Sequence, residues 1–463
     1  MQDLLTPAMQ DLRSELGAVV SILEERAPYG AIFLSFQEMT QYMVDNNQEK
    51  VVPGEPTAGV ILRVFDGRTM RERSLGGFNR ETVILEAKDL IAGVSFPGNG
   101  KIDAGKERTE NFQTEMEQDP AAVPTRKKLD YLREINQRIN QIDNRILNAQ
   151  VSFLELRQKT VFRSRAEDLA QDIQRLNISV LVTMMGENGV VYDRISKSGT
   201  AGLEILDFKD AELDDLVHNT ILLLGAERID PGEYTVVTAP GVSGVICHES
   251  FGHGVETDMF LKERAKAVNF VGKRVGSELV DIYDDPSLPG KFGSYFFDDE
   301  GLPAKPTRIV SKGIFERGLT DQYSAAALGI ERSPNGRRQD LTRKIYPRMT
   351  NTFFGSGSTP VKELIGQVED GIYIPKYSSG MEDPKGWGIQ VTGHFGFKIK
   401  GGKITEKIYS PVVMTGYVPD VLASISAVGN DFELSGGYCG KGTKEIVPVT
   451  AGGPHLLMKA RLG

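Results

Sequence analysis

The pattern of apolar residues changes near residue 229, and this change most constrains the fold. Before it, stretches with helical spacing alternate with strand-like runs; after it, glycines, aromatic residues and short apolar alternations dominate. The Pro-Gly pair in ERIDPGEY separates the two patterns. We therefore predict an α+β protein of two domains. Residues 1–228 should form an N-terminal α/β domain of helices on antiparallel sheet, and residues 229–463 a C-terminal, mostly β domain.

Apolar spacing also predicts the first elements of the chain. From Leu5 to Leu23, apolar residues recur at steps of three, four and seven, which predicts one face of a single helix. The runs AIFLSF and GVILRVF predict strands. Asn79 is placed to cap a second helix over residues 79–93.

The rest of the N-terminal half predicts a loop, two helices and a hairpin. The polar, glycine- and lysine-rich passage over 98–120 is typical of an exposed loop. Apolar residues from Leu132 to Ile146 predict a helix that covers a sheet. A hairpin should turn at residues 186–189, and a last helix should end at Gly225.

Composition excludes several classes of partner. The chain has 463 residues with 54 basic and 63 acidic side chains, which gives a net charge of −9. This balance argues against nucleic acid and against an anionic membrane surface. No uninterrupted apolar run approaches the roughly 20 residues of a membrane helix, and two cysteines are too few for a disulfide framework. We therefore expect a cytoplasmic protein.

The stretch VICHESFGHG contains two histidines around a glutamate, as metal-binding motifs of peptidases do. His248 and His253 are five residues apart, so an ideal α-helix would place them about 140° apart, on different faces. A π-type turn or a break in the helix would bring both rings to one ion. Gly252 and Gly254 flank His253 and permit such a distortion.

A catalytic zinc site needs three protein ligands, so a distant residue must supply the third. The candidates are Cys439, His394, His455, Glu256 and Asp258. Cys439 lies in the glycine-flanked stretch SGGYCGKG, which allows close approach to a metal. Cys247 would point about 100° away from His248, so we interpret it as a small buried apolar residue. His218 and His455 are otherwise expected to be structural or exposed, and His394, between strand-like residues in TGHFGF, is only an outside candidate.

Glu249 follows the first histidine and is the candidate general base, because a carboxylate beside a ligand can accept the proton of a metal-activated water. The alternative is a salt-bridged carboxylate on a helix. Lys441 is a candidate for stabilising an oxyanion, but a solvated loop charge is the favoured interpretation.

The segment HESFGHGVETD resembles the HExxxH segment of the TldD/PmbA metallopeptidases. The segments PRMTNTFFGSGSTPVKELIGQVEDGIYI, ISAVGNDFEL and GYCGKG follow in the order of that family, and the resemblance spans about residues 55–460. It implies that His248, His253 and Cys439 are metal ligands and that Glu249 is the catalytic carboxylate. The retained HExxxH is similar to the catalytic TldD-type members. After CGKG, this chain reads TKEIVPV where the family pattern has a Gln before Pro-Val.

The resemblance also implies partners: an unfolded peptide as substrate, and a homodimer or a heterodimer with a family paralogue, in the cytoplasm. Zn²⁺ is the expected ion, and Fe²⁺ is the alternative because two histidines and a cysteine also suit iron. We predict a metal-dependent peptidase that acts on extended or unfolded peptides. The rival functions are a non-catalytic scaffold or regulatory subunit and a different metal amidohydrolase, such as an amidase or deformylase.

Overall fold

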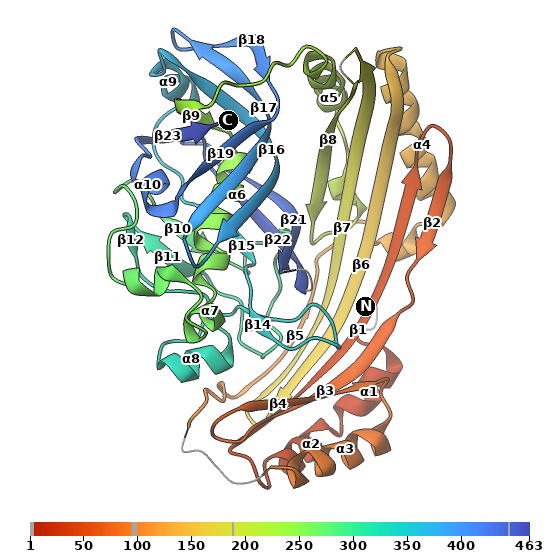
Figure 1. Ribbon diagram of the computed structural model, residues 1–463. Helices are drawn as coiled ribbons and strands as arrows, with labels where there is room; N and C mark the ends of the chain where they lie inside the picture. Colours follow the sequence, from red (N-terminus) through yellow and green to blue (C-terminus); the bar gives the residue numbers. More distant parts are fainter. Residues whose placement is uncertain (1–3, 95–99, 188, 443–444) are drawn as a thin grey trace.

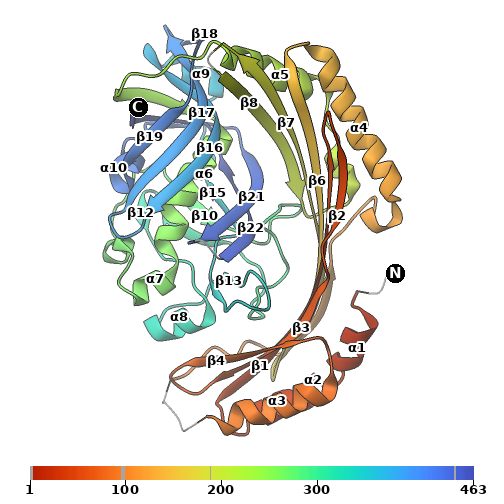
Figure 2. The same ribbon diagram turned by 45° about the vertical axis from the view of Figure 1, so that its right-hand side comes forward.

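The computed structural model describes residues 4–94, 100–187, 189–442 and 445–463. A long twisted sheet from the N-terminal half stands beside a β-rich body from the C-terminal half (Figure 1). Figure 2 shows that the sheet curves around this body and carries its helices on the outer face. The fold is therefore α+β with a β-rich C-terminal part, as the sequence predicts.

The elements of the N-terminal half are α1 (Pro7–Arg13), α2 (Leu16–Leu23), β1 (Tyr29–Val44), β2 (Glu49–Pro53), β3 (Thr57–Phe65), β4 (Met70–Gly76), α3 (Arg80–Ala92), β5 (Arg108–Gln113), η1 (Pro120–Ala122), α4 (Thr125–Ile142), β6 (Ile146–Ser164), β7 (Glu167–Gly186), β8 (Gly189–Gly199), η2 (Leu203–Leu206) and α5 (Asp210–Leu223). The strands form one sheet in the order β4-β3-β1-β6-β7-β5, with β2 paired to β1 and β8 to β7. All pairs are antiparallel except β5 with β7.

Successive side chains of a strand point to opposite sides, and the central strand β1 packs apolar residues on both faces of the sheet. On β1, Ile32 and Leu34 pack with α1, α2 and α3. Ala31 and Phe33 pack on the other face against Phe297 of the C-terminal body. Further along, α4 and α5 cover the even-numbered apolar residues of β7. The odd-numbered residues of β7 are left to face the C-terminal body.

The predicted role of Asn79 as the N-cap of a helix is confirmed, because its side chain accepts a 2.9 Å hydrogen bond from the backbone N–H of Thr82. The single helix predicted from Leu5 to Leu23 is wrong, because α1 ends at Arg13 and α2 starts at Leu16. At the break, the Ser14 hydroxyl donates to the Asp11 carbonyl, a local bond that competes with helical pairing.

Two further expectations need correction. The passage over 98–120 is not simply a loop, because β5 adds to the edge of β7 and Phe112 stacks on Phe296 at 5.0 Å. Residues 98 and 99 lie outside the described ranges. Ile146 belongs to β6 rather than to the preceding helix. Helix α4 ends at Ile142, and Asp143 adopts an extended conformation that turns the chain into the strand.

The elements of the C-terminal half are β9 (Gly232–Thr238), α6 (Pro240–Phe251), η3 (His253–Val255), α7 (Thr257–Leu261), η4 (Lys266–Phe270), β10 (Ile282–Asp284), β11 (Thr307–Ser311), β12 (Ile314–Phe315), α8 (Gln322–Leu328), β13 (Gly336–Arg337), β14 (Tyr346–Pro347), β15 (Asn351–Phe354), α9 (Val361–Gly366), β16 (Asp370–Asp383), β17 (Gly388–Lys400), β18 (Lys403–Tyr409), β19 (Val412–Tyr417), α10 (Val418–Ala423), β20 (Ala427–Val428), β21 (Glu433–Lys441), β22 (Glu445–Gly453) and β23 (Leu456–Leu462). The predicted division at residue 229 falls between α5 and β9 and stays a prediction.

These strands form two main sheets around α6. One sheet runs β16-β9-β23-β19-β17-β18 and closes on itself because β17 also pairs with β16. The other runs β12-β11-β10-β15-β22-β21, so β21 is an edge strand. Helix α6 lies between them, and nearly all its residues are buried. None of the helices within the described ranges is long and apolar enough to cross a membrane.

Helix α6 begins at Pro240, a residue suited to the first helical position because its missing N–H has no helical partner to lose. Gly244 allows the helix to approach β22, since a Cβ there would lie 2.3 Å from the backbone nitrogen of Gly452. A helix that is buried on every side should be apolar throughout. His248 and Glu249 near its end are therefore costly to bury, and they mark the site.

Candidate active site

The predicted distortion between the two histidines is a break in the helix. Helix α6 ends at Phe251, and η3 begins at His253 after Gly252, whose φ and ψ are −102° and −84°. A Cβ on Gly252 would lie 1.8 Å from the Met349 sulfur, so only glycine fits there. The break places the rings of His248 and His253 with centroids 5.3 Å apart. Of the two predicted alternatives, the break occurs and not the continuous π-type turn.

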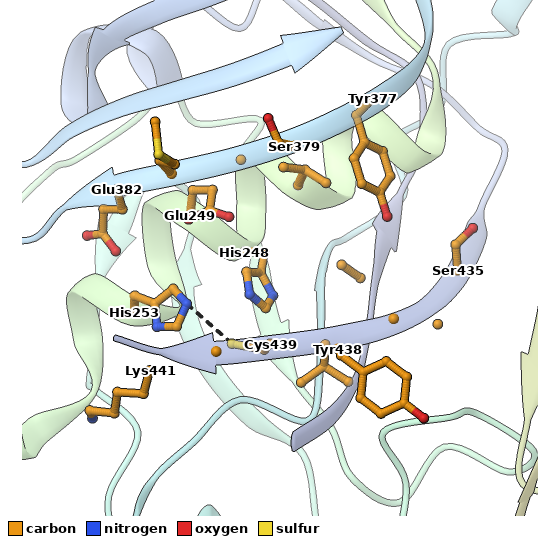
Figure 3. Close-up of a pocket in the computed structure, with 18 of the residues that line it drawn as sticks. His248, Glu249, His253, Tyr377, Ser379, Glu382, Ser435, Tyr438, Cys439 and Lys441 are labelled. Atoms are coloured by element: carbon orange, nitrogen blue, oxygen red, sulfur yellow. Dashed lines mark hydrogen bonds between the residues drawn. The ribbon is translucent and has the colours of Figure 1, made fainter. Parts of the chain in front are cut away.

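Strand β21 brings the third candidate ligand to the histidines (Figure 3). The Cys439 sulfur lies 3.2 Å from Nε2 of His253. One potential ligand atom from each of Cys439, His248 and His253 lies within 4.8 Å of the others. Among the described residues, this is the one group of three or more such side chains with this spacing.

The remaining candidates for the third ligand have other partners. Nδ1 of His455 contacts Asp431 at 2.7 Å, and Nε2 of His394 contacts the Tyr192 carbonyl at 2.8 Å. Asp258 accepts a 2.8 Å hydrogen bond from Lys262. These residues therefore do not join the group.

Two minor expectations are confirmed. Cys247 is completely buried in the apolar core and is separate from the ligand group. His218 is exposed on α5.

Electrostatics mark Cys439 as a thiolate. Burial alone would raise the pKa of Cys439, but the charges of His248 and His253 lower it well below the ordinary value. Burial would likewise lower the pKa of His253, and the facing sulfur raises it well above the usual range. A thiolate is the form of cysteine that binds metals.

Glu249 lies beside the group and is available for proton transfer. Burial raises the pKa of its carboxyl above the usual value, while the His248 and His253 charges oppose the rise. In the described part of the chain, this carboxylate forms no hydrogen bond or ion pair with another residue. The alternative, a helix carboxylate held in a salt bridge, is therefore not what the structure shows. A Cβ on Gly380 would lie 2.6 Å from Glu249 Oε1, so strand β16 runs directly over it.

Sequence reasoning missed the contacts that hold the ligands. Arg348 donates to the Cys439 sulfur at 3.2 Å and to the Cys439 carbonyl at 3.0 Å. Its Nε lies 3.3 Å from Glu256, and the same carboxylate lies 3.5 Å from Nδ1 of His253. Such outer contacts fix the orientation of ligands and the tautomer of histidines. The sequence near Arg348 carries no local signal of this, because Cys439 is 91 residues away.

The expectation that Lys441 is a solvated loop charge is wrong. Its side chain is largely buried, and the ammonium lies 2.9 Å from Glu256 and 2.5 Å from Asp258. It is therefore neither a solvated loop charge nor free to approach an oxyanion. Burial opposes ionisation of Glu256, but Lys441, His253 and Arg348 lower the pKa of Glu256 far below its usual range.

The ligand group lies in a cavity of about 820 Å³ between the two halves of the molecule. Asn177 and Arg194 of the N-terminal sheet line one side. Residues 377–382 of β16 and 435–442 of β21 line two other sides, and Figure 3 shows these strands above and below the histidines. Among the described residues, strand β21 pairs only with β22 and this part of β16 only with β17, so each strand has a free edge.

The chemistry of the donors fits a metal. Nδ1 of His248 is buried and has no hydrogen-bond partner among the described residues, although buried polar atoms normally have one. Two imidazoles and a thiolate form the kind of three-residue set that catalytic zinc sites use. The spacing of at most 4.8 Å between donor atoms is one that a single ion can bridge.

Known proteins of similar sequence are metalloproteases. The family model described as PmbA/TldA metallopeptidase C-terminal domain matches residues 231–461. A metalloprotease from Synechocystis is 30% identical over 460 residues, with 97% of each chain covered. One from Methanothermobacter thermautotrophicus is 28% identical over 96% of this chain and 97% of its own. A relative from Saccharolobus solfataricus, 27% identical over 72% of this chain and 74% of its own, is named a zinc metalloprotease TldD homolog.

Solved structures share the fold at low sequence identity. A putative modulator of DNA gyrase from Thermotoga maritima has a TM-score of 0.79 at 17% identity, covering 98% of this chain and 100% of its own. TldE from Thermococcus kodakarensis has a TM-score of 0.73 at 15% identity, with the same coverage. The family model and the sequence relatives, rather than these structures, define the class as the metallopeptidases. The chain belongs to the TldD/PmbA family, as its motifs predict.

Proposed function

We propose that this protein is a metal-dependent peptidase that hydrolyses peptide bonds in unfolded or extended peptides. His248, His253 and Cys439 hold the metal, which is Zn²⁺ or, as the alternative, Fe²⁺. The observation that carries the proposal is the convergence of these three donor atoms within 4.8 Å, beside an unpaired Glu249 and in a large cavity. The metalloprotease names of the relatives support the same activity.

Each residue has a role in the proposed reaction. When bound, the ion supplies positive charge that polarises the scissile carbonyl and makes a water molecule more acidic. Glu249 takes the proton of the attacking water and returns it to the leaving amine. Its raised pKa suits this role, because a base that later acts as an acid works best with a pKa near the working pH. Arg348 and Glu256 hold Cys439 and His253 in place.

The free strand edges that border the cavity support an extended substrate. Unpaired backbone groups on a strand edge are a template for another extended chain. The free edges of β16 and β21 border the cavity on two sides of the ligand group. Backbone pairing of this kind contacts only main-chain groups of the substrate, so peptides with many different side chains can bind. A folded protein would not fit, because its own strands and helices already use those groups.

We also propose a dimer, either with a second copy or with a family paralogue, in the cytoplasm. The likeness to TldE of Thermococcus kodakarensis supports a relationship with a paralogue, and the net charge of −9 argues against nucleic acid as a partner. Light scattering at micromolar concentration should give twice the mass of one chain, or this mass only after the paralogue is added. A single-chain mass under both conditions contradicts the proposal.

The activity is tested by mass spectrometry of an unfolded peptide library incubated with the metal-loaded protein. We expect new peptide termini that appear with time and disappear when chelator is added. Products without any metal dependence would reject the proposed chemistry. Bound metal without products would favour a scaffold, and release of acetyl or formyl groups without chain cleavage would favour an amidohydrolase.

A further inference from the structure

A second cavity of about 290 Å³ lies next to the candidate active site. Gln171, Ile173 and Arg175 of β7 line it on the N-terminal side, and Arg337 lines it on the C-terminal side. Tyr438, the neighbour of Cys439 on β21, lines both cavities. In Figure 3, the Tyr438 ring points away from the histidines. The two cavities therefore meet at this strand.

Strand β7 forms a continuous wall along both cavities. Its odd-numbered residues share one face of the sheet, since side chains alternate along a strand. Residues 171, 173 and 175 of this face line the second cavity, and residues 177 and 179 line the first. The first and the second cavity therefore follow one another along the same face of β7.

The second cavity contains two arginines without a carboxylate partner. Arg175 and Arg337 are buried, with 3% and 6% of their surface exposed. Arg175 donates to the carbonyls of Phe292 and Ser294 at 3.0 and 2.8 Å. Arg337 donates to the Met349 carbonyl at 2.6 Å. Neither has a carboxylate within 4.0 Å in the described ranges, although buried charges are normally paired.

The acidic residues of the cavity form no ion pair with these two arginines in the described ranges, although the nearby charge of Asp299 acts on both. Asp298 already accepts from Arg332 at 3.2 Å and from three backbone N–H groups. Asp340 accepts from Thr342. Asp299 accepts from the backbone N–H of Arg338 at 2.8 Å and makes no ion pair with Arg175 or Arg337.

The charge of Arg337 also disfavours the charged form of the Arg175 guanidinium. Burial and, next, the charge of Arg337 lower the pKa of Arg175 to about 9. Arg338, the neighbour of Arg337, differs because its guanidinium pairs with Glu72 at 3.0 Å. Of the three arginines that line this cavity, Arg175 and Arg337 are therefore the two without an ion pair to a described residue.

We propose that Arg175 and Arg337 bind a carboxylate in this cavity, namely the C-terminal carboxylate of a peptide that lies in the candidate active site. Two guanidiniums match the planar, two-oxygen geometry of a carboxylate. The peptide as ligand rests on the proposed function, whereas a small free organic acid offers the same chemistry. The site gives the peptidase a preference for chains whose free C-terminus lies a short distance beyond the metal.

The test compares two peptides that differ only at the C-terminus. Fluorescence anisotropy measures binding of a labelled, N-acetylated peptide of about ten residues, which spans about 33 Å when extended. One form has a free carboxylate and the other an amide. Metal-loaded Glu249→Gln protein serves as the reference, because it should not cleave the probe. We expect the acid to bind at least about tenfold more tightly than the amide.

The variants Arg337→Gln and Arg338→Gln then assign the effect. The acid-to-amide ratio should fall to about one in Arg337→Gln and persist in Arg338→Gln, whose arginine is already paired. Because the ratio is internal to each protein, a loss of folded protein in either variant does not change it. A preference that survives in Arg337→Gln, or that disappears equally in both variants, overturns the site.

Titration of N-acetylglycine by calorimetry distinguishes a small free organic acid from the peptide C-terminus as the ligand of the site. Binding that depends on Arg337, together with equal affinity for the two peptides, keeps the carboxylate site and assigns it to a small acid. The absence of any Arg337-dependent binding of peptide or N-acetylglycine overturns the proposal. These measurements need no turnover, so a protein that binds the acid form but cleaves nothing would reject the peptidase activity and retain the site.

Discussion

Two clusters of buried charged residues differ in whether their carboxylates are paired. In the interface cluster, Glu300 accepts from Arg63 of β3 at 2.7 Å and from the backbone N–H of Gln322 at 2.6 Å. Its neighbour Asp298 accepts from a second arginine and three backbone groups. The metal cluster is the candidate metal-binding group of His248, His253 and Cys439 with the adjacent Glu249. In it, Glu249 has no hydrogen-bond partner among the described residues, and Nδ1 of His248 is buried without one.

This difference separates a structural role from a functional one. The interface cluster joins the N-terminal sheet to the C-terminal body, and its carboxylates form ion pairs within the chain. Buried groups that the chain leaves unsatisfied cost free energy unless a ligand pairs with them. The metal cluster is such a place. Substitutions should therefore reduce stability in the first cluster, and metal binding or activity in the second.

The largest effect is expected at Glu249. Glu249→Gln keeps the shape of the side chain but cannot accept a proton, so kcat should fall by about 10² to 10⁴-fold. Metal content and the free energy of unfolding should hardly change. Steady-state kinetics and elemental analysis of the same preparation check this. If the variant retains full activity, another group is the base.

The matched change in the interface cluster is Glu300→Gln. It leaves Arg63 short of one buried partner, so the free energy of unfolding should fall by about 3 kcal/mol. Metal bound per folded chain should stay the same. Denaturant unfolding and elemental analysis measure the two quantities. Loss of metal without loss of stability would remove the distinction between the clusters.

Arg348 tests whether outer contacts tune the metal cluster. Arg348→Lys keeps the positive charge, but a single ammonium cannot contact both Cys439 and Glu256 as the guanidinium does. Loss of an outer contact typically weakens metal affinity by about 10- to 100-fold. Chelator competition measures that affinity. An unchanged affinity would mean that Arg348 serves the fold alone.

Glu167 provides a smaller, pH-dependent effect beside the interface cluster. Burial raises its pKa to about 7, while the Arg332 charge opposes the rise. Between pH 4.5 and 7, the unfolded chain releases this proton and the folded protein keeps it, so stability falls as pH rises through this window. Across this window, the free energy of unfolding of the native protein should fall by about 2 to 3 kcal/mol through this group, and Glu167→Gln should remove this fall. Unfolding curves across this pH range would contradict the assignment if both proteins gave the same slope.

The sequence predicts the fold class and the residues of the site better than it predicts their surroundings. His248, Glu249 and His253 are recognisable because they lie within six residues, and Gly252 indicates where the helix can break. Cys439 was one of several candidates until the family resemblance singled it out. The physical reason is that the approach of β21 to α6 depends on pairing between distant strands.

Contacts between distant charged residues carry no local pattern. Lys441 lies in a glycine-rich stretch that suggests solvent exposure, yet its ammonium is held by Glu256 and Asp258. The burial of Arg175 and Arg337 in one cavity depends on how the two halves pack. The break between α1 and α2 was missed for a local reason, because apolar spacing does not register a serine that bonds to the backbone.

Binding of one metal ion by His248, His253 and Cys439 is tested most directly by the metal content of two cysteine variants. The purified native protein should hold close to one metal per chain by inductively coupled plasma mass spectrometry. Cys439→Ser should lose most of that metal, whereas Cys247→Ser should keep it because its side chain lies in the apolar core. Full metal in Cys439→Ser, or loss of metal in Cys247→Ser alone, would contradict this assignment.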